Sequence, residues 1–157
     1  VSGTCSEAGI APHLVRDVFM VLRVNPIRVG TGGGQVSGPM PTETDWDAVA
    51  ARAGRDPDEL RDFERGSVSG ITRRVAEFDF DQARYNAALN GATQLALTFA
   101  DYIDPANTES RSFEALTPET LEFIAQIEER VGVPVTLASV GHFPGCILDR
   151  RPQQRLR

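Results

Sequence analysis

The spacing of apolar residues along this chain changes several times, from the period of a helix to that of a strand and back. Apolar positions with helical spacing run from Pro12 to about Arg23, so a largely buried helix is predicted there. A short extended piece is expected over 24–29, and glycines and prolines exclude regular structure from 30 to 44. The first third should therefore contain one buried helix and one long loop, and long loops usually carry function.

Two short helices are predicted after this loop, because residues that favour helix ends mark their limits. Thr44 is placed to cap a helix over 45–53, which ends at Gly54. Pro57 can begin a second helix that runs to about Arg65.

The second half contains two units in which a helix is followed by a strand. The first unit has a helix at 79–89 and a strand at 94–99, and the second has a helix at 117–130 and a strand at 133–138. Short helical connections favour parallel strands in one sheet. The predicted fold class is therefore α/β, with a partly parallel sheet flanked by helices.

Length and charge narrow the possibilities further. A chain of 157 residues suits a single domain, assigned to 1–149, followed by a basic tail at 150–157. The net charge of −6 argues against broad binding of nucleic acid or an anionic membrane. All 16 basic residues are arginine, which excludes lysine chemistry. No apolar run approaches the roughly 18 to 20 residues of a membrane span, so a soluble, cytoplasmic protein is expected.

Cysteine and histidine are too sparse to suggest a metal site. Cys5 and Cys146 lie at opposite ends of the chain without the spacing of metal ligands. We expect two free thiols in a reducing compartment. His13 and His142 are also far apart in sequence, so no metal ligands are assigned.

The carboxyl ends of the two predicted parallel strands are the first candidate site, because ligands of open parallel sheets bind there. These ends carry Phe99-Ala100-Asp101 and Ser139-Val140-Gly141. Asp101 can accept paired hydrogen bonds from a guanine-like edge, or it can serve as a cap or turn residue. Phe99 can stack on a base or belong to the core. Ser139 and Gly141 allow close approach of a planar ligand, or form an ordinary turn.

A second candidate is the segment Ser67-Val68-Ser69-Gly70-Ile71-Thr72-Arg73-Arg74. Its hydroxyls, flexible glycine and two guanidinium groups could hold a carboxylate or a phosphate. The alternative is a solvated turn with surface arginines. Arg28 offers another cation near the long loop, or forms a salt bridge. Glu77, Asp79 and Asp81 are interpreted as acids that stabilise the start of the next helix.

Seven short segments stand out in order along the chain: Cys5-Ser6-Glu7-Ala8-Gly9-Ile10-Ala11-Pro12, Arg28-Val29-Gly30, Ser37-Gly38-Pro39-Met40-Pro41-Thr42-Glu43, Ser69-Gly70 with Arg73-Arg74, Leu89-Asn90-Gly91, Leu97-Thr98 with Asp101, and Gly132-Val133-Pro134-Val135. Together they resemble adenylosuccinate synthetase, especially the compact form found in archaea and phages. The resemblance covers nearly the whole chain. It implies the C-terminal portion of a P-loop-like nucleotide ligase fold.

The resemblance also implies a reaction. The family uses GTP and Mg²⁺ to phosphorylate the 6-oxygen of inosine monophosphate (IMP), and L-aspartate then displaces the phosphate. By matching position, Ser67 to Arg73 would form the loop that closes on aspartate, and Arg73 would also reach the nucleotide phosphates. Phe99, Ala100 and Asp101 would meet the guanine of GTP, with Asp101 reading its edge. Ser139, Val140 and Gly141 would flank the same base, and a homodimer is implied.

Three departures from the family pattern leave alternatives open. Ile71 replaces an arginine that contacts aspartate, and Phe99 replaces a lysine, so ATP could replace GTP. The phosphate loop, the catalytic residues and the Mg²⁺ ligands of the family would precede Val1, and glycines 30–34 lack the phosphate-loop pattern. No catalytic residue is assigned, a missing N-terminal half is expected, and the chain alone is predicted to be inactive.

Three other functions therefore stand beside the leading one. The first is a phage-type 2-aminoadenylosuccinate synthetase, which joins aspartate to dGMP with ATP. The second is a non-catalytic nucleotide-binding derivative of the family. The third is an α/β domain without a ligand.

Overall fold

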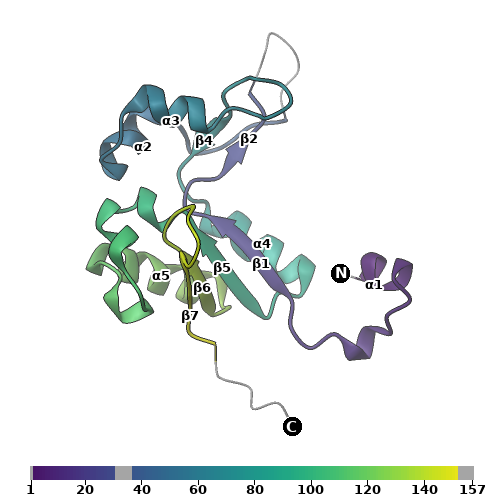
Figure 1. Ribbon diagram of the computed structural model, residues 1–157. Coiled ribbons are helices and arrows are strands. Elements are labelled where there is room, and N and C mark those ends of the chain that lie inside the picture. The colour runs from purple at the N-terminus through teal and green to yellow at the C-terminus, as the bar shows by residue number, and fades with distance from the viewer. Residues whose placement is uncertain (1, 31–36, 152–157) are drawn as a thin grey trace.

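A four-stranded sheet forms the centre of the larger of two lobes (Figure 1). The computed structural model describes residues 2–30 and 37–151. The sheet has the order β1-β5-β6-β7, in which β1, β5 and β6 are parallel and β7 is antiparallel to β6. The strands span Phe19–Arg23 (β1), Gln94–Thr98 (β5), Val135–Ser139 (β6) and Ile147–Asp149 (β7). The parallel pairing of the two predicted strands is confirmed.

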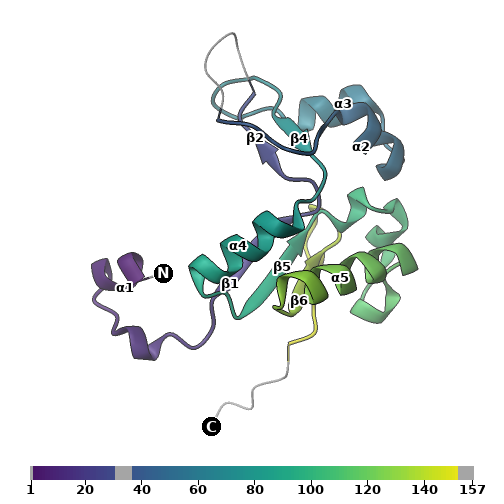
Figure 2. The same cartoon turned by 180° about the vertical axis from the view of Figure 1, so that it is seen from behind.

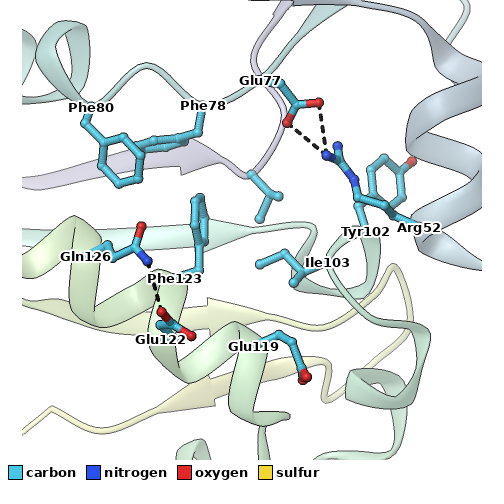
Figure 3. Close-up of a pocket in the computed structure, with 11 residues that line it drawn as sticks. Arg52, Glu77, Phe78, Phe80, Tyr102, Ile103, Glu119, Glu122, Phe123 and Gln126 are labelled. Carbon is cyan, nitrogen blue, oxygen red and sulfur yellow. Dashed lines mark hydrogen bonds and ion pairs between the residues drawn. The ribbon is translucent and has the colours of Figure 1, made fainter.

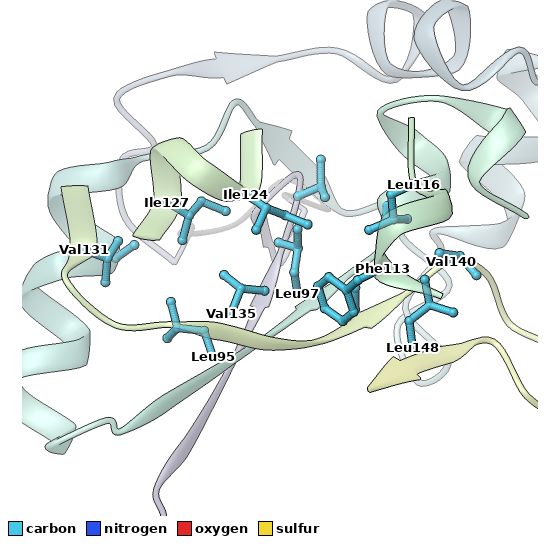
Figure 4. Packing of buried hydrophobic residues seen from close by; sticks show 14 of the residues in the cluster. Leu95, Leu97, Phe113, Leu116, Ile124, Ile127, Val131, Val135, Val140 and Leu148 are labelled. Atoms are coloured by element: carbon cyan, nitrogen blue, oxygen red, sulfur yellow. The ribbon is translucent and has the colours of Figure 1, made fainter. Parts of the chain in front are cut away.

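Two helices, α4 (Phe80–Asn90) and α5 (Pro118–Val131), cover one face of this sheet, as Figure 2 shows from behind. Between β5 and α5 the chain forms three short turns of 3-10 helix: η2 (Ala100–Tyr102), η3 (Pro105–Glu109) and η4 (Phe113–Ala115). Helix α5 starts with Pro118 in its first turn and ends at Gly132 with φ 77°, as the sequence predicts. Its apolar face packs on β5 and β6 to form the main core, whose members include Leu95, Leu97, Ile124, Ile127 and Val135 (Figure 4).

The small lobe is built on a three-stranded antiparallel sheet in the order β2-β4-β3. Its strands are short: Ile27–Arg28 (β2), Glu43–Thr44 (β3) and Arg74–Ala76 (β4). Helices α2 (Trp46–Ala53) and α3 (Pro57–Phe63) pack against it. The small core contains Trp46, Val49, Ala50, Ala53, Leu60, Val75 and Tyr102. Since Tyr102 belongs to η2, this residue ties the small lobe to the large one.

The predicted helix at 12–23 is wrong. One 3-10 turn, η1 (Pro12–Leu14), is followed by an extended connection and by β1. β1 pairs with β5 along its whole length, from Phe19 opposite Gln94 to Arg23 opposite Thr98. A short apolar run has no unique period, and pairing with a distant strand decided its conformation. A helix that was not predicted, α1 (Ser2–Glu7), lies in an N-terminal arm apart from both lobes (Figure 1).

The remaining predictions agree with the structure to within two residues at most ends, with two corrections in the small lobe. The helix after the long loop is capped by the Asp45 side chain, which accepts from Ala48 N at 2.8 Å, and not by Thr44. Thr44 belongs to β3, so the 30–44 segment is not wholly irregular. Residues 31–36 of that segment and 152–157 of the basic tail lie outside the described residues. In the two described stretches, no helix has the length and apolar character needed to cross a bilayer.

Candidate functional site

The two strand tips, residues 99–101 and 139–141, lie at the same edge of the large sheet. β5 and β6 are adjacent and parallel, with Leu97 opposite Ala138, so the residues that follow them emerge side by side. Ala100 and Val140 are both 0% exposed and anchor the tips in the main core. The tips therefore have a fixed backbone, as a binding site on a rigid scaffold requires.

Phe99 has a left-handed backbone conformation, with φ 66° and ψ 40°, unlike any other non-glycine residue in the described chain. This conformation ends β5 at Thr98 and turns the chain into η2. It costs roughly 1–3 kcal/mol for a residue with a side chain, and such residues cluster at functional sites. The centroid of the Phe99 ring lies 5.0 Å from that of the Tyr102 ring. Phe99 thus packs against the small-lobe core, which agrees with the alternative that it is a core residue.

Asp101 lies two residues after Phe99, inside η2, and is half-buried. Its Oδ1 atom is buried and has no hydrogen-bond partner among residues 2–30 and 37–151. Burial raises the pKa of this carboxyl above its ordinary value, opposed first by its own backbone N–H and then by the charges of Arg55, His142 and Arg23. Buried hydrogen-bond acceptors nearly always have a donor, so this oxygen is a candidate acceptor of a hydrogen bond from a ligand.

The tip after β6 is closely packed on itself. Ser139 Oγ donates to Gly141 O at 3.0 Å. A Cβ on Gly141 would lie 2.6 Å from the Phe143 ring, so glycine allows that ring to pack there. The next side chain, His142, has its ring 5.5 Å from that of Phe63 on α3. The β6 tip therefore also reaches the small lobe.

Sequence reasoning missed two charged residues at this edge. Arg23, the last residue of β1, lies with its guanidinium carbon 3.7 Å from the centroid of the Phe99 ring. Its Nη2 atom is 2.6 Å from Oε1 of Glu64, which follows α3 and is only 1% exposed. Arg23 stood at the end of a segment assigned to a helix, and its Glu64 partner is 41 residues away, so the pattern carried no signal of the pair.

The 67–73 loop, Ser67 to Arg73, leaves the small lobe as a hairpin. A bridge between Arg65 and Thr72 closes its base, and Gly70 turns the chain with φ 65°. Ser67, Val68, Ser69 and Gly70 are exposed, whereas Ile71, Thr72 and Arg73 are partly covered. Gly30 lies so close to the base of this hairpin that a Cβ atom on Gly30 would be 2.2 Å from the Thr72 carbonyl oxygen.

Arg73 is the member of this loop that the structure brings toward the strand tips. Its Nη1 atom lies 3.5 Å from Oε2 of Glu64, the carboxylate that also holds Arg23. Its carbonyl oxygen accepts from Trp46 Nε1 at 2.7 Å. Among the described residues, no hydrogen bond or ion pair joins the exposed Ser67–Gly70 part to residues 99–101 or 139–141.

Other charged candidates have structural roles. Arg74 pairs with Glu43 at 2.5 Å, and Arg28 donates to the carbonyl of Ser37. Asp79 caps α4 by accepting from Gln82 N at 2.9 Å, as predicted. Glu77 pairs with Arg52 at 3.0 Å beside a cleft of about 450 Å³, which the aromatic side chains of Phe78, Phe80 and Phe123 also line (Figure 3).

In residues 2–30 and 37–151, no three side chains of histidine, cysteine, aspartate or glutamate gather as a metal site. Cys5 is buried and Cys146 is partly buried, and both are free thiols, as predicted.

Open α/β sheets bind ligands, nucleotides among them, at the carboxyl ends of their parallel strands, which is where this chain presents Asp101 and a serine–glycine turn. Comparison with known families is more specific. The model of the adenylosuccinate synthetase family matches residues 1–108, and this chain belongs to that family.

Curated relatives match this chain over almost its full length. Adenylosuccinate synthetase of Pyrococcus horikoshii is 40% identical over 150 residues, which is 96% of this chain, and that of Archaeoglobus fulgidus is 38% identical over 153 residues, which is 98% of this chain. The chain spans only about 40% of the length of these relatives.

Solved structures share the fold. Adenylosuccinate synthetase of Plasmodium falciparum, solved in a fully ligated form, has a TM-score of 0.76 at 18% identity and covers 96% of this chain, which covers 44% of it. Succinoaminodeoxyadenylate synthetase of cyanophage S-2L, bound to dGMP and dATP, has a TM-score of 0.69 at 23% identity. It covers 94% of this chain, which covers 38% of it. The α/β fold expected from the sequence is confirmed.

Proposed function

We propose that this chain supplies the base end of a nucleoside triphosphate site and the aspartate loop of a ligase that joins L-aspartate to IMP with hydrolysis of GTP. The observation that carries the proposal is the buried, unpartnered Oδ1 of Asp101 at the tip of β5, beside the tip of β6. Family membership and about 40% identity to named adenylosuccinate synthetases support the choice of reaction.

The geometry supports one role for each part of the site. Guanine presents two neighbouring N–H donors, and the Asp101 carboxylate can accept both. The backbone of Ser139 to Gly141 would lie along the same base. Arg73 has a guanidinium fork that matches phosphate or carboxylate, and it follows an exposed, glycine-containing turn suited to closing over aspartate.

The phosphoryl-transfer groups belong elsewhere in this proposal. The chain has no lysine for a phosphate loop. The described residues also gather no carboxylate set that would hold Mg²⁺, so its ligands are assigned to the part of the enzyme that the relatives have beyond this chain. We assign to this chain binding and orientation, which lower the barrier by holding reactants in place. A cytoplasmic homodimer is proposed from the same resemblance, and sedimentation velocity would measure the oligomeric state.

The experiment uses the complete assembly, in which this chain is joined to the polypeptide that covers the remaining length of the relatives. Product is followed with L-aspartate and either IMP with GTP or dGMP with ATP. We expect turnover with IMP and GTP, a loss of at least tenfold in GTP affinity for Asp101→Ala, and no change for the exposed control Glu129→Gln. Turnover only with dGMP and ATP would assign the phage-type reaction. Nucleotide binding without turnover on either pair would contradict a ligase and indicate a binding protein.

A further inference from the structure

The Glu64 carboxylate lies where the small lobe meets the strand tips. It receives donors from three side chains that come from different parts of the chain. Arg23 contributes Nη2 to Oε1 at 2.6 Å and Nη1 to Oε2 at 3.4 Å, and the Tyr102 hydroxyl donates to Oε1 at 2.9 Å. Arg73 places Nη1 at 3.5 Å from Oε2. One carboxylate that is 1% exposed thus holds two arginines and a tyrosine.

The physical cost of this arrangement makes a purely stabilising role a poor explanation. Removing a carboxylate and a guanidinium from water is expensive, and well-packed apolar residues of similar volume often stabilise a protein as well or better. What a buried ion pair provides instead is a fixed geometry. Here that geometry includes the two candidate parts of the ligand site.

On the large-lobe side, Glu64 holds Arg23 in one orientation. The Arg23 guanidinium lies 3.7 Å from the centroid of the Phe99 ring, at the end of β5. The Arg23 charge also lowers the pKa of the neighbouring Asp101, against the larger effect of burial. Glu64 therefore fixes one wall beside the acid proposed to read the base.

On the small-lobe side, Glu64 holds the last residue of the 67–73 loop. The Arg73 carbonyl is fixed by the indole N–H of Trp46 at 2.7 Å, while its side chain reaches Glu64 at 3.5 Å. This contact is the longest that Glu64 makes with any of its three partners. An anionic ligand can therefore draw the Arg73 guanidinium away while Arg23 and Tyr102 keep the carboxylate satisfied.

We propose that Glu64 is a positioning residue that holds the Arg73 and Arg23 side chains in a fixed arrangement, so that the 67–73 loop and the base site act as one nucleotide site. The inference rests on the proposed function, because it assigns Arg73 and Asp101 to a shared ligand. Glu64 itself does not touch that ligand. It acts through the two arginines.

The test uses the complete assembly and the isosteric variant Glu64→Gln. This change removes the negative charge and leaves the shape. We expect the KM for GTP and for L-aspartate each to rise at least tenfold. Arg73→Gln should weaken GTP binding strongly in the parent, but by less than threefold in the Glu64→Gln background, because Arg73 is already misplaced there.

A matched control separates positioning from stability. Val49→Ala truncates an apolar side chain of the same small-lobe core that is 0% exposed and cannot hydrogen-bond to Glu64. It should lower Tm by at least as much as Glu64→Gln and leave both KM values within twofold. Equal KM values for the two variants, or fully additive effects of Glu64→Gln and Arg73→Gln, would overturn the proposal.

Failure of the ligase assignment gives a different result. If the parent assembly turns over neither substrate pair, the dissociation constants of GTP and ATP are measured for the same variants by calorimetry. A tenfold weakening in Glu64→Gln but not in Val49→Ala supports the positioning role without the ligase reaction. Unchanged affinity, or no nucleotide binding by the parent, overturns it.

Discussion

The two lobes hold their candidate ligand-binding residues in opposite ways. In the large lobe, the backbone of the strand tips is anchored by two buried apolar residues, Ala100 and Val140, and the buried Oδ1 of Asp101 lacks a hydrogen-bond partner among the described residues. In the small lobe, Arg73 is held by side-chain contacts to Glu64 and Trp46 at the end of an exposed hairpin. Under the proposed function, the strand tips give a rigid surface for the base and the 67–73 loop gives an adjustable contact for the charged substrate.

This difference has a physical basis in the two cores. The main core is a continuous layer between α4, α5 and the four-stranded sheet (Figure 4). The small core joins two short helices to strands of two or three residues. Segments with few buried contacts open at lower free energy than core strands. The 67–73 loop should therefore exchange amide hydrogens faster than the strand tips.

The largest effect is expected in the core behind the strand tips. Leu97, which is 1% exposed, lies in β5 two residues before Phe99. Leu97→Ala leaves a cavity and should lower the free energy of unfolding by about 3 kcal/mol. Leu89→Ala on α4, where the side chain is 67% exposed, should change it by less than about 0.5 kcal/mol. Urea titration measures both, and a loss below about 1 kcal/mol for Leu97→Ala would contradict a rigid base surface.

A smaller effect is expected where the base of the 67–73 loop meets β2. Gly30→Ala places a Cβ against the Thr72 carbonyl, which must shift. The free energy of unfolding should fall by about 1–2 kcal/mol, as for other overpacked sites, and affinity for L-aspartate should fall more than affinity for GTP. Gly3→Ala, where the new Cβ meets nothing within 4 Å, is the control. Equal losses of both affinities would contradict a loop that contacts L-aspartate more directly than it contacts GTP.

The smallest effect is expected from the pH dependence of two carboxylates that differ in burial. Burial raises the pKa of Asp101, whereas hydrogen bonds from Arg151 lower the pKa of the exposed Asp149 to about 2. Between the ordinary pKa of 3.8 and its raised value, Asp101 binds more proton when folded, so its contribution to stability improves as pH falls through that raised value. The Asp149 contribution is present above pH 3.8 and is lost as pH falls toward 2.

Both shifts can be followed in one carboxyl NMR titration. GTP affinity should fall as Asp101 becomes protonated, because a protonated acid cannot accept both N–H donors. GTP affinity should not change as Asp149 becomes protonated. A titration of Asp101 at or below 3.8 would be inconsistent with the burial of its Oδ1 atom.

The regular parts of the large lobe could be predicted from the sequence. The helix of α5 has a proline start, a glycine stop and a clear apolar face, and the strands that follow α4 and α5 are short apolar runs between turns. Parallel pairing then placed Asp101 and Ser139 at one edge. The prediction failed for β1 because an apolar run of five residues fits a helix as well as a strand. Its pairing with the distant strand β5 determines the conformation.

The charged anchor could not be predicted. Glu64 and Arg23 are ordinary polar positions in their own segments, and their contact depends on how β1 and α3 meet in space. The two-residue strands β2 and β3 are also too short to show a period. The backbone of Phe99 gave no signal either, since a positive φ is expected from glycine rather than phenylalanine.

The most direct test of the account measures how tightly GTP, inosine triphosphate and ATP bind the complete assembly before and after Asp101→Asn. Inosine triphosphate lacks the 2-amino donor, so the parent should bind it with an affinity between those for GTP and ATP. Asp101→Asn should weaken GTP binding by roughly 10- to 100-fold, in line with the loss of hydrogen bonds to a charged acceptor, and should leave ATP within twofold. Unchanged GTP affinity in Asp101→Asn would contradict the claim that this strand tip reads the base.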